Sequence, residues 1–182
     1  MERNRDGSTI VLQHKTNAKK RIEMGQTLHD RIKQSAPFED RAQEAMLNLF
    51  VASAHVRRRV EAACNEFDLQ FAHHNVLRIL RGVHPKGHPR CEIIERMLDP
   101  SPDVTRLIDK LVERGLVERS RSAEDRRMTI HTITAEGLAL LDDLAPKIRA
   151  VQDWFDERVA DRDLRHLSRI CEGIYEDYGP EE

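Results

Sequence analysis

The chain has 182 residues, of which 34% are charged and 4% are aromatic, and its formal net charge is -2. Its mean hydropathy is -0.64, and no apolar run approaches the ~20 residues that a transmembrane helix needs. We therefore expect a cytoplasmic protein with no membrane partner. A polar, helix-rich chain of this size has a modest core, which favours burial of further apolar surface between subunits.

Charge is unevenly distributed along this nearly neutral chain. Residues 1–35 hold eight Lys and Arg against four Asp and Glu, whereas residues 139–182 hold six against twelve. A protein that keeps its acidic residues away from a nucleic-acid surface can bind phosphates with a total charge near zero. The distribution therefore permits a nucleic-acid partner but does not by itself predict one.

The N-terminal third divides into an arm and a long helix. We expect residues 1–37 to form a basic arm, mobile or partly helical, because apolar residues between Ala18 and Gln34 are sparse. From Glu39 to Asn65 apolar residues recur at steps of three and four, which predicts an amphipathic helix of about 25 residues. Such a helix is roughly twice the mean length in globular proteins, so residues 38–66 are assigned to a first dimerisation helix.

Two short helices are predicted next. Leu69 to Leu80 carries apolar residues at helical spacing, and Gly82 follows where a C-terminal glycine cap belongs. The segment from His84 to Pro89 is rich in proline and histidine and is expected to be a loop. Residues 90–98 are expected to form the second helix, and a tight turn leads from it into the next element.

The clearest predicted element is the helix that follows this turn. Ser101 is a candidate N-cap, and Pro102 suits the first helical position, where a missing N–H costs nothing. Asp103 would lie in the first turn, near the positive end of the helix dipole, and Gly115 ends the helix. One face is an apolar stripe formed by Val104, Leu107, Ile108, Leu111 and Val112. The opposite face is polar and is free to meet a partner.

A β-hairpin follows the helix directly. Leu116 to Arg119 and Met128 to Ile133 are predicted to pair as strands, with a charged turn from Ser120 to Arg127. Residues 67–134 therefore predict a winged helix-turn-helix lobe. The predicted fold class is mainly α with a small β-hairpin wing.

The C-terminal part is expected to be helical. Thr134 is predicted to cap a long helix, which Pro146 should interrupt and bend. A last helix is predicted from Asp161 to Tyr178. The near-heptad spacing of apolar residues suits helix–helix packing, so residues 135–179 are assigned to C-terminal dimerisation helices.

The polar face of the helix after Ser101 carries the candidate DNA contacts. Thr105 and Arg106 lie early in this helix, where the second helix of a helix-turn-helix reaches base edges, and an arginine there can make a bidentate contact to guanine. Asp103 either accepts from a cytosine amino group or only caps the helix. Ser101 and Lys110 complete the set. Lys110 and Arg114 lie further along the helix and are better placed for phosphates.

The hairpin turn collects three arginines. Arg121, Arg126 and Arg127 predict a wing that inserts an arginine into the minor groove. A solvated, salt-bridged turn is the alternative for an isolated hairpin. Asp125 is expected to pair with a neighbouring arginine and to stiffen the tip.

Residues 103–141 resemble the MarR family of bacterial transcriptional regulators. The resemblance rests on a helix ending in ERGLV, on DRR at residues 125–127 in the family's Asp-x-Arg wing pattern, and on ITAEG at residues 133–137. It extends over about residues 39–178. It implies that Arg127 is the wing arginine, with Asp125 as its paired aspartate.

The resemblance also implies function and partners. The protein would be a homodimer with intertwined first and last helices, and its two wings would straddle a pseudo-palindromic operator in double-stranded DNA. A ligand-responsive repressor of this kind would bind a small-molecule effector, with phenolic or aromatic compounds as candidates, at residues that the sequence does not identify.

Two other interpretations are open. One is a winged-helix module that binds proteins and never touches DNA. The other is a metal-sensing regulator that uses His84, His88 and Cys91, although this set lacks a fourth ligand. Sequence motifs for phosphate loops, nucleophile elbows and metalloproteases are missing, so we expect no enzyme and no cofactor. Cys64, Cys91 and Cys171 are expected to be reduced packing residues.

Overall fold

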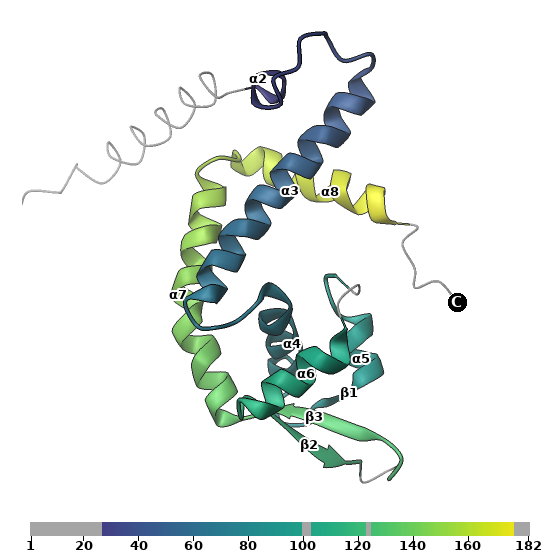
Figure 1. Cartoon of the computed structure of the whole chain (residues 1–182), viewed down its shortest axis with the longest axis vertical. Helices are drawn as coiled ribbons and strands as arrows, with labels where there is room; N and C mark the ends of the chain where they lie inside the picture. The colour runs from purple at the N-terminus through teal and green to yellow at the C-terminus, as the bar shows by residue number, and fades with distance from the viewer. Residues whose placement is uncertain (1–26, 100–102, 123–124, 177–182) are drawn as a thin grey trace, which may run out of the picture. The chain divides into compact units, whose positions relative to one another are not determined.

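The computed structural model describes residues 27–99, 103–122 and 125–176. The chain forms two compact units, and the long helices α3 and α7 contribute to both. Unit 1 contains residues up to His55 and residues from Val151 to Gly179, and unit 2 contains Val56–Ala150. The fold is mainly helical with one small antiparallel sheet, as the sequence predicted (Figure 1). None of the described helices combines the length and apolar character needed to cross a membrane.

The predicted helices of unit 2 are present, with shifted ends. Helix α3 (Arg41–Asn65) is followed by α4 (Phe71–Arg81), α5 (Arg90–Glu95) and α6 (Val104–Glu113). Gly82 is the C-cap of α4, but its φ of -62° is right-handed and does not require glycine. Gly115 follows α6 with φ +70°, a left-handed conformation in which glycine avoids the strain of a side chain.

The sheet has one strand more than the sequence predicted. Strand β2 (Val117–Arg121) pairs with β3 (Thr129–Ile133) as the expected hairpin, and β1 (His88–Pro89) pairs with the other edge of β3. The prediction that residues 84–89 form only a loop is therefore wrong for the last two residues, which form β1. Gly87 explains the approach, because a Cβ there would overlap the His131 carbonyl oxygen, and its φ is +73°.

The core of unit 2 lies between α4, α6 and the sheet. Helix α4 packs against α5, α6 and β3, and α6 also contacts β2. The predicted apolar stripe of α6 is the face that is buried, with Leu111 fully enclosed and Ile108 1% exposed. Burial of each such side chain contributes about 1.5–3 kcal/mol, which fixes the polar face of α6 toward solvent.

Helix α7 (Ala135–Asp156) starts at the predicted cap. The Thr134 hydroxyl oxygen accepts from the Gly137 amide at 3.1 Å. Pro146 lies inside α7 without ending it, so the predicted interruption is wrong. Leu141 and Leu144 bring the first half of α7 into the core of unit 2.

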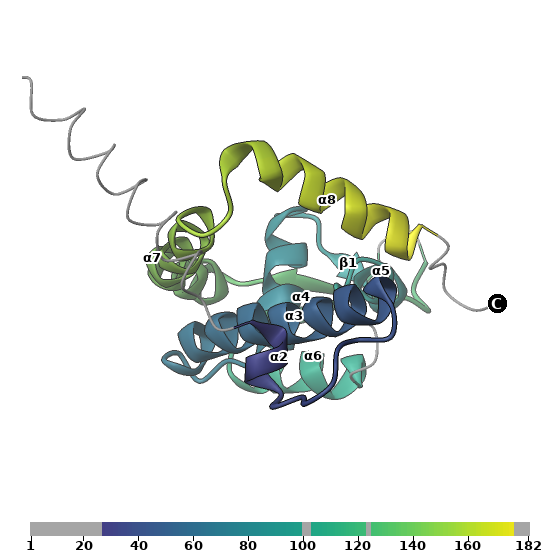
Figure 2. The same cartoon turned by 90° about the horizontal axis from the view of Figure 1, so that it is seen from above.

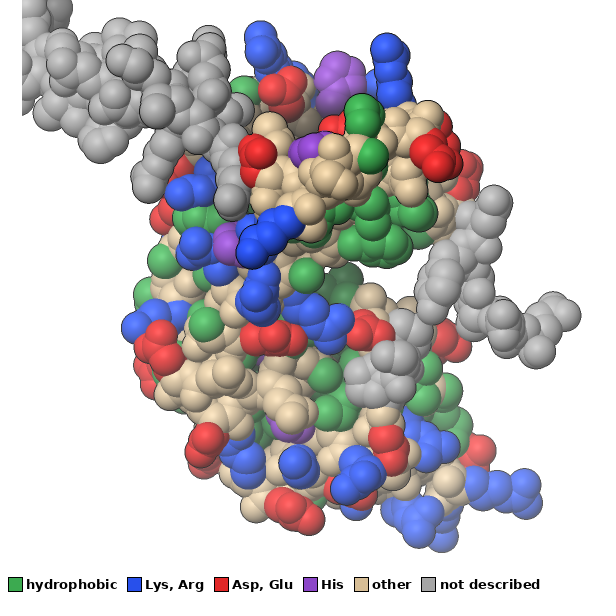
Figure 3. Space-filling model, turned by 45° about the horizontal axis from the view of Figure 1, so that its top comes forward, with side chains coloured by type: hydrophobic (Ala, Val, Ile, Leu, Met, Phe, Trp, Pro, Cys, Tyr) green, Lys and Arg blue, Asp and Glu red, His purple; other side chains and the backbone are tan. Residues whose placement is uncertain are grey.

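Unit 1 buries far less apolar surface. Helix α2 (Leu28–Arg31) is the described part of the weak helix expected between residues 18 and 34, and residues 1–26 lie outside the description. Figure 2 shows α8 (Asp161–Tyr175) apart from α3, and none of the residues of α8 is buried in the single chain. Figure 3 shows hydrophobic side chains gathered on this unit. The exposed apolar side chains include Met46 and Phe50 of α3 and Ile170, Ile174 and Tyr175 of α8.

Candidate nucleic-acid interface

The start of α6 is capped by Asp103. Its side chain accepts a hydrogen bond from the Arg106 amide at 3.3 Å, which satisfies one of the free N–H groups of the first turn. The prediction that Ser101 caps the helix, with Pro102 at its first position, is wrong, because the helix begins at Val104. Ser101 itself lies outside the described residues. The sequence allowed Asp103 either to cap the helix or to contact a base, and its hydrogen bond shows the capping role.

An arginine from the preceding helix reaches the start of α6. The Arg90 guanidinium at the first position of α5 donates to the Thr105 hydroxyl at 3.0 Å. Thr105, Arg106 and Arg90 are all exposed, so the ends of α5 and α6 present two arginines and a hydroxyl together. Sequence reasoning missed Arg90, since no local pattern indicates a contact across fifteen residues.

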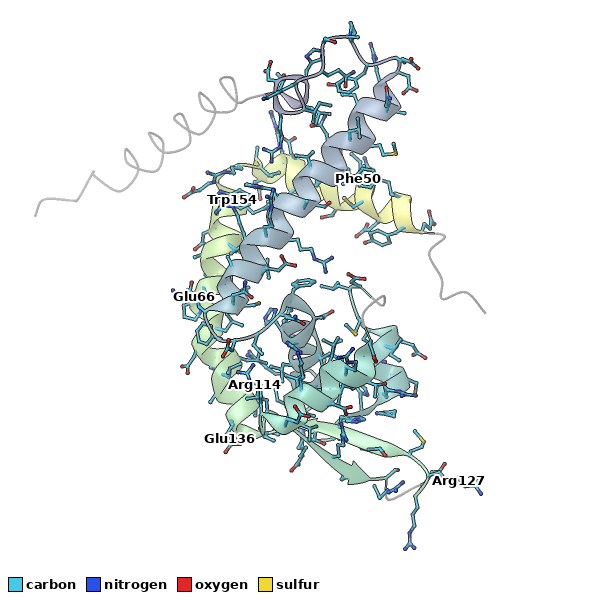
Figure 4. The ribbon with its side chains drawn as sticks, viewed as in Figure 1. Phe50, Glu66, Arg114, Arg127, Glu136 and Trp154 are labelled. Atoms are coloured by element: carbon cyan, nitrogen blue, oxygen red, sulfur yellow. The ribbon has the colours of Figure 1, made fainter. Side chains whose placement is uncertain are left out.

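The last turns of α6 are less available for contacts with DNA phosphates than the sequence indicated. Arg114 donates from both terminal nitrogens, to the Asp68 carbonyl at 2.6 Å and to the Phe67 carbonyl at 3.1 Å. These bonds attach α6 to the turn between α3 and α4 (Figure 4). Arg114 is thus a structural residue, not the free phosphate contact that its position suggested. Lys110 is exposed, and it forms no ion pair with another described residue.

The base of the wing is joined to α6 by an ion pair. Arg119 of β2 pairs with Asp109 of α6, and both side chains are a little less than half exposed. A pair this exposed contributes only about 0.2–1 kcal/mol. Its geometry nevertheless links the strand that leads to the wing tip with the helix whose polar face carries Arg106.

The wing tip is organised by backbone hydrogen bonds. The Asp125 carboxylate accepts from the Arg127 amide at 2.9 Å, and Arg121 donates to the Arg126 carbonyl at 3.2 Å. Asp125 therefore stiffens the turn through a main-chain amide. The prediction that it pairs with an arginine side chain is wrong, because no such ion pair is present among the described residues. Residues 123 and 124 are outside the description.

Two arginines project from this stiffened turn. Arg126 and Arg127 are exposed and form no ion pair with another described residue. Figure 4 shows Arg127 at the tip, pointing away from the sheet, and blue side chains gather around the tip in Figure 3. Exposed guanidinium groups on a rigid turn are suited to phosphate or minor-groove contacts.

A buried histidine lies under the wing. His131 in β3 is 6% exposed, and its Nδ1 has no hydrogen-bond partner among the described residues. Burial lowers the pKa of His131, and the positive charges of Arg119 and Arg90 lower it further. The ring is therefore neutral at neutral pH, so the positive charge of this surface comes from its arginines and lysine.

The candidate metal ligands do not converge. No group of three or more His, Cys, Asp or Glu side chains within the described ranges has a geometry that could hold a metal ion, and His84, His88 and Cys91 all lie in those ranges. His88 is part of β1, whereas Cys91 is exposed and so is not the packing residue expected. Cys64 is fully buried, and burial raises its pKa to about 11, which leaves an unreactive thiol.

Sequence and structure both resemble known regulators. Residues 67–128 match a sequence model described as the MarR family. The HTH-type transcriptional regulator MhqR of Bacillus subtilis (strain 168) is 31% identical over 135 residues, which cover 72% of this chain and 92% of that protein. A MarR transcription factor from Planctomyces limnophilus has a crystal structure that is 37% identical, with a TM-score of 0.58, and the match covers 75% of this chain and 98% of the other.

One similar structure contains a bound ligand. CouR from Rhodococcus jostii RHA1, solved with p-coumaroyl-CoA, is 25% identical with a TM-score of 0.66. The match covers 79% of this chain and 100% of CouR. The similarity therefore extends beyond the sheet and its neighbouring helices to most of the described chain.

Proposed function

This chain belongs to the MarR family of transcriptional regulators, and on that premise we propose that it is a ligand-responsive repressor that binds a pseudo-palindromic DNA operator as a homodimer. The observation that carries the proposal is the exposed cationic set on unit 2. Arg106 lies at the start of α6, and Arg126 and Arg127 lie on a wing joined to the same helix by the Asp109–Arg119 pair.

We assign the DNA contacts by the chemistry of each side chain. Arg106 and Thr105 contact base edges in the major groove, with Arg90 holding the threonine hydroxyl. Lys110 contacts a phosphate. Arg127 and Arg126 enter or flank the minor groove.

The remaining candidate residues take supporting roles in this proposal. Asp103 fixes the first turn of α6, and Asp125 and Arg121 hold the wing turn through backbone groups. Ser101 would contact a phosphate beside the start of the helix. These roles predict that their loss weakens DNA binding through misplacement of neighbouring groups.

Unit 1 supports assembly as a dimer. Phe50 is 60% exposed, Ile170 59% and Ile174 62% in the single chain. Monomeric proteins rarely leave a large contiguous apolar surface in water, so we assign residues 38–66 and 135–179 to dimerisation and 67–134 to DNA binding, with residues 1–37 as a basic arm. A two-fold axis would place half-sites about 34 Å apart.

The response to a ligand is proposed from the relatives. CouR was solved with p-coumaroyl-CoA, an aromatic acyl compound, and this chain shares its fold over most of its length. An effector that changes the separation of the two wings would lower operator occupancy, because the half-sites have a fixed spacing. Phenolic and aromatic acids are the effectors to test first.

The experiment is a gel shift and footprint with DNA flanking the gene that encodes the chain. We expect a protected pseudo-palindrome, a linear fall of log affinity with log salt, and release by one of the candidate ligands. A heparin column separates the alternative of a protein-interaction module, which would show neither retention nor a shift at moderate salt. No shift on any flanking fragment would contradict the proposal.

A further inference from the structure

The segment that leads into α6 is held by side chains of two earlier helices. Residues 96–103 join α5 to α6. The side-chain oxygen of Asn75 in α4 accepts from the Leu98 amide at 2.8 Å. Both terminal nitrogens of Arg57 in α3 donate to one carboxylate oxygen of Asp99 at 3.1 Å. Two neighbouring residues ahead of α6 are therefore fixed from two different helices, and all of these contacts lie within unit 2.

Asn75 acts on this segment more than on the core around it. Its side chain is 8% exposed, and it is followed in α4 by Val76 and Leu77, which are fully buried. A buried amide without a partner costs about 1–3 kcal/mol, so a polar residue at this position needs the bond that the Leu98 amide provides. The Leu98 side chain is 72% exposed. Leu98 is therefore fixed by its backbone hydrogen bond and not by burial of its side chain.

Arg57 is oriented toward Asp99 by two further contacts. Its Nε donates to the Glu61 carboxylate at 3.1 Å, one turn later in α3, and its guanidinium lies over the Phe71 ring, 5.4 Å from the centroid. The Asp99 side chain is 29% exposed. A single exposed ion pair contributes about 0.2–1 kcal/mol, but a pair that belongs to a network of charges contributes more. Arg57 therefore joins α3, α4 and the segment ahead of α6.

We propose that Asn75 and Arg57 are positioning residues for operator recognition, which set the placement of α6 and thereby of Arg106. The apolar face of α6 determines which side of the helix faces solvent. Apolar packing is non-directional, whereas a base contact needs a side chain placed to within about 0.5 Å. The directional bonds to Leu98 and Asp99 supply that restraint ahead of the helix. This role rests on the proposed function and adds to it two residues that determine specificity through α6.

A positioning role and a general loss of folding have different consequences for DNA binding. Binding to an arbitrary sequence depends on phosphate contacts, whereas binding to an operator depends also on base contacts. Loss of positioning therefore lowers the ratio of operator affinity to non-operator affinity. Partial unfolding lowers both affinities together and leaves this ratio unchanged.

The experiment measures this ratio for the full chain at one salt concentration, with the footprinted fragment and a scrambled fragment of equal length. Arg57→Gln should lower the ratio at least about threefold, as expected for a residue within one hydrogen-bonded network. Arg149→Gln removes the same charge from an exposed position of α7 and should leave the ratio unchanged. A wild-type ratio in Arg57→Gln would overturn the inference.

The partner of Arg57 is tested by a double-mutant cycle. Asp99→Asn should lower the ratio by the same factor as Arg57→Gln, and the double variant should lower it no further, because each change breaks the same contact. The loss of one charge in each variant alters binding to both fragments and cancels in the ratio. Fully additive losses would show that the two residues act separately and would overturn the contact as the cause.

Asn75 is tested by two variants that differ in the acceptor oxygen. Asn75→Leu removes the acceptor and should lower the ratio, whereas Asn75→Asp keeps an oxygen at the same place and should retain more of it. The ratio does not depend on the folded fraction, so it can be measured even if a variant is less stable. Equal ratios in the two variants would overturn the role of Asn75.

Amide hydrogen exchange tests the positioning without DNA. Arg57→Gln should speed exchange of the Leu98 amide, which is bonded to Asn75, and of the amides in the first turn of α6, whereas Arg149→Gln should not. Unchanged exchange would overturn the positioning role whether or not the chain binds DNA. A wild type that binds its operator, with the same ratio in Arg57→Gln, would overturn this inference alone. A wild type that binds neither fragment would overturn the proposed function and, with it, the role in recognition.

Discussion

Units 1 and 2 use their apolar residues in opposite ways. In unit 2 the apolar faces of α4, α6 and α7 enclose a continuous core that includes Leu77, Leu111 and Leu144. In unit 1 the only buried apolar side chain among the described residues is Leu28, whereas Phe50 and Ile170 are more than half exposed. The same chain therefore contains a part with its own core and a part without one.

Helix α3 shows this difference along a single element. Near its C-terminus Ala63 and Cys64 are buried in the core of unit 2, but toward its N-terminus Met46 is 51% and Phe50 60% exposed. Both ends have helical apolar spacing, so periodicity alone does not tell a core from an interface. The difference teaches that unit 2 is stabilised by its own packing, and the exposed apolar residues of unit 1 support the proposal that this unit packs against a second copy.

The largest expected effect is on the core of unit 2. Leu111→Ala removes a fully buried side chain and should lower the free energy of unfolding by about 2–5 kcal/mol, because the cavity it leaves is only partly refilled. Leu98→Ala is the matched control, since Leu98 is 72% exposed. Urea unfolding followed by circular dichroism measures both. Equal losses in the two variants would contradict the core described for unit 2.

The next effect tests unit 1. Phe50→Asp places a charge on the exposed apolar face of α3 and should weaken dimerisation by about 2–4 kcal/mol, as for a central interface residue. Asn48→Asp adds the same charge two residues away, on the opposite side of the helix, and should change little. Sedimentation equilibrium gives the dimer dissociation constant. If the wild-type chain is monomeric at all concentrations, the exposed apolar face of unit 1 is not a dimer interface, and the proposed difference between the units is wrong.

A substitution on the polar face of α6 should have a smaller effect, which is on DNA recognition and not on the folding of either unit. Arg106→Ala should lose about 1–3 kcal/mol of discrimination at one base pair per half-site, because a bidentate contact to guanine is removed. Binding to operators with single base changes measures this loss. If the variant weakens all operators equally, Arg106 contacts a phosphate and does not read a base.

Arg127→Ala should have a more uniform effect. Removal of one wing cation should weaken binding to most sequences and should reduce the slope of log affinity against log salt by about 1 per wing. Titrations at several salt concentrations measure the slope. Arg158 also is a cation, but it lies over the Trp154 ring in unit 1, so Arg158→Ala should leave the slope unchanged.

The sequence predicted those features that depend on local signals. The stripe from Val104 to Leu111 is one-sided, and Gly115 follows it, so both the buried face and the end of α6 were predictable. The hairpin was predictable because its strands are separated by a short charged turn. The exposure of Arg126 and Arg127 follows from their place in that turn, although their contacts with DNA stay predictions.

Features that depend on distant contacts were not predictable. Strand β1 exists because Gly87 allows the chain to approach β3, more than forty residues later. Arg114 has the pattern of a free cation, yet its partner Asp68 is 46 residues away. The cap of α6 was misplaced because Ser101 and Asp103 are both good N-caps, and the helix begins where Val104 first meets the core.

The two units should differ in how acid changes their stability, because the buried histidines His73, His74 and His131 all lie in unit 2. Burial lowers the pKa of each below the usual histidine value of 6.5, and neighbouring cations lower it further. The unfolded chain takes up these protons first, so the stabilisation is complete above pH 6.5 and is lost as the pH falls below it. His131→Gln should reduce this dependence, whereas exposed His84→Gln should not, in urea unfolding at about pH 8 and about pH 5.5. Equal pH dependence in both variants would show that His131 is not among the groups responsible.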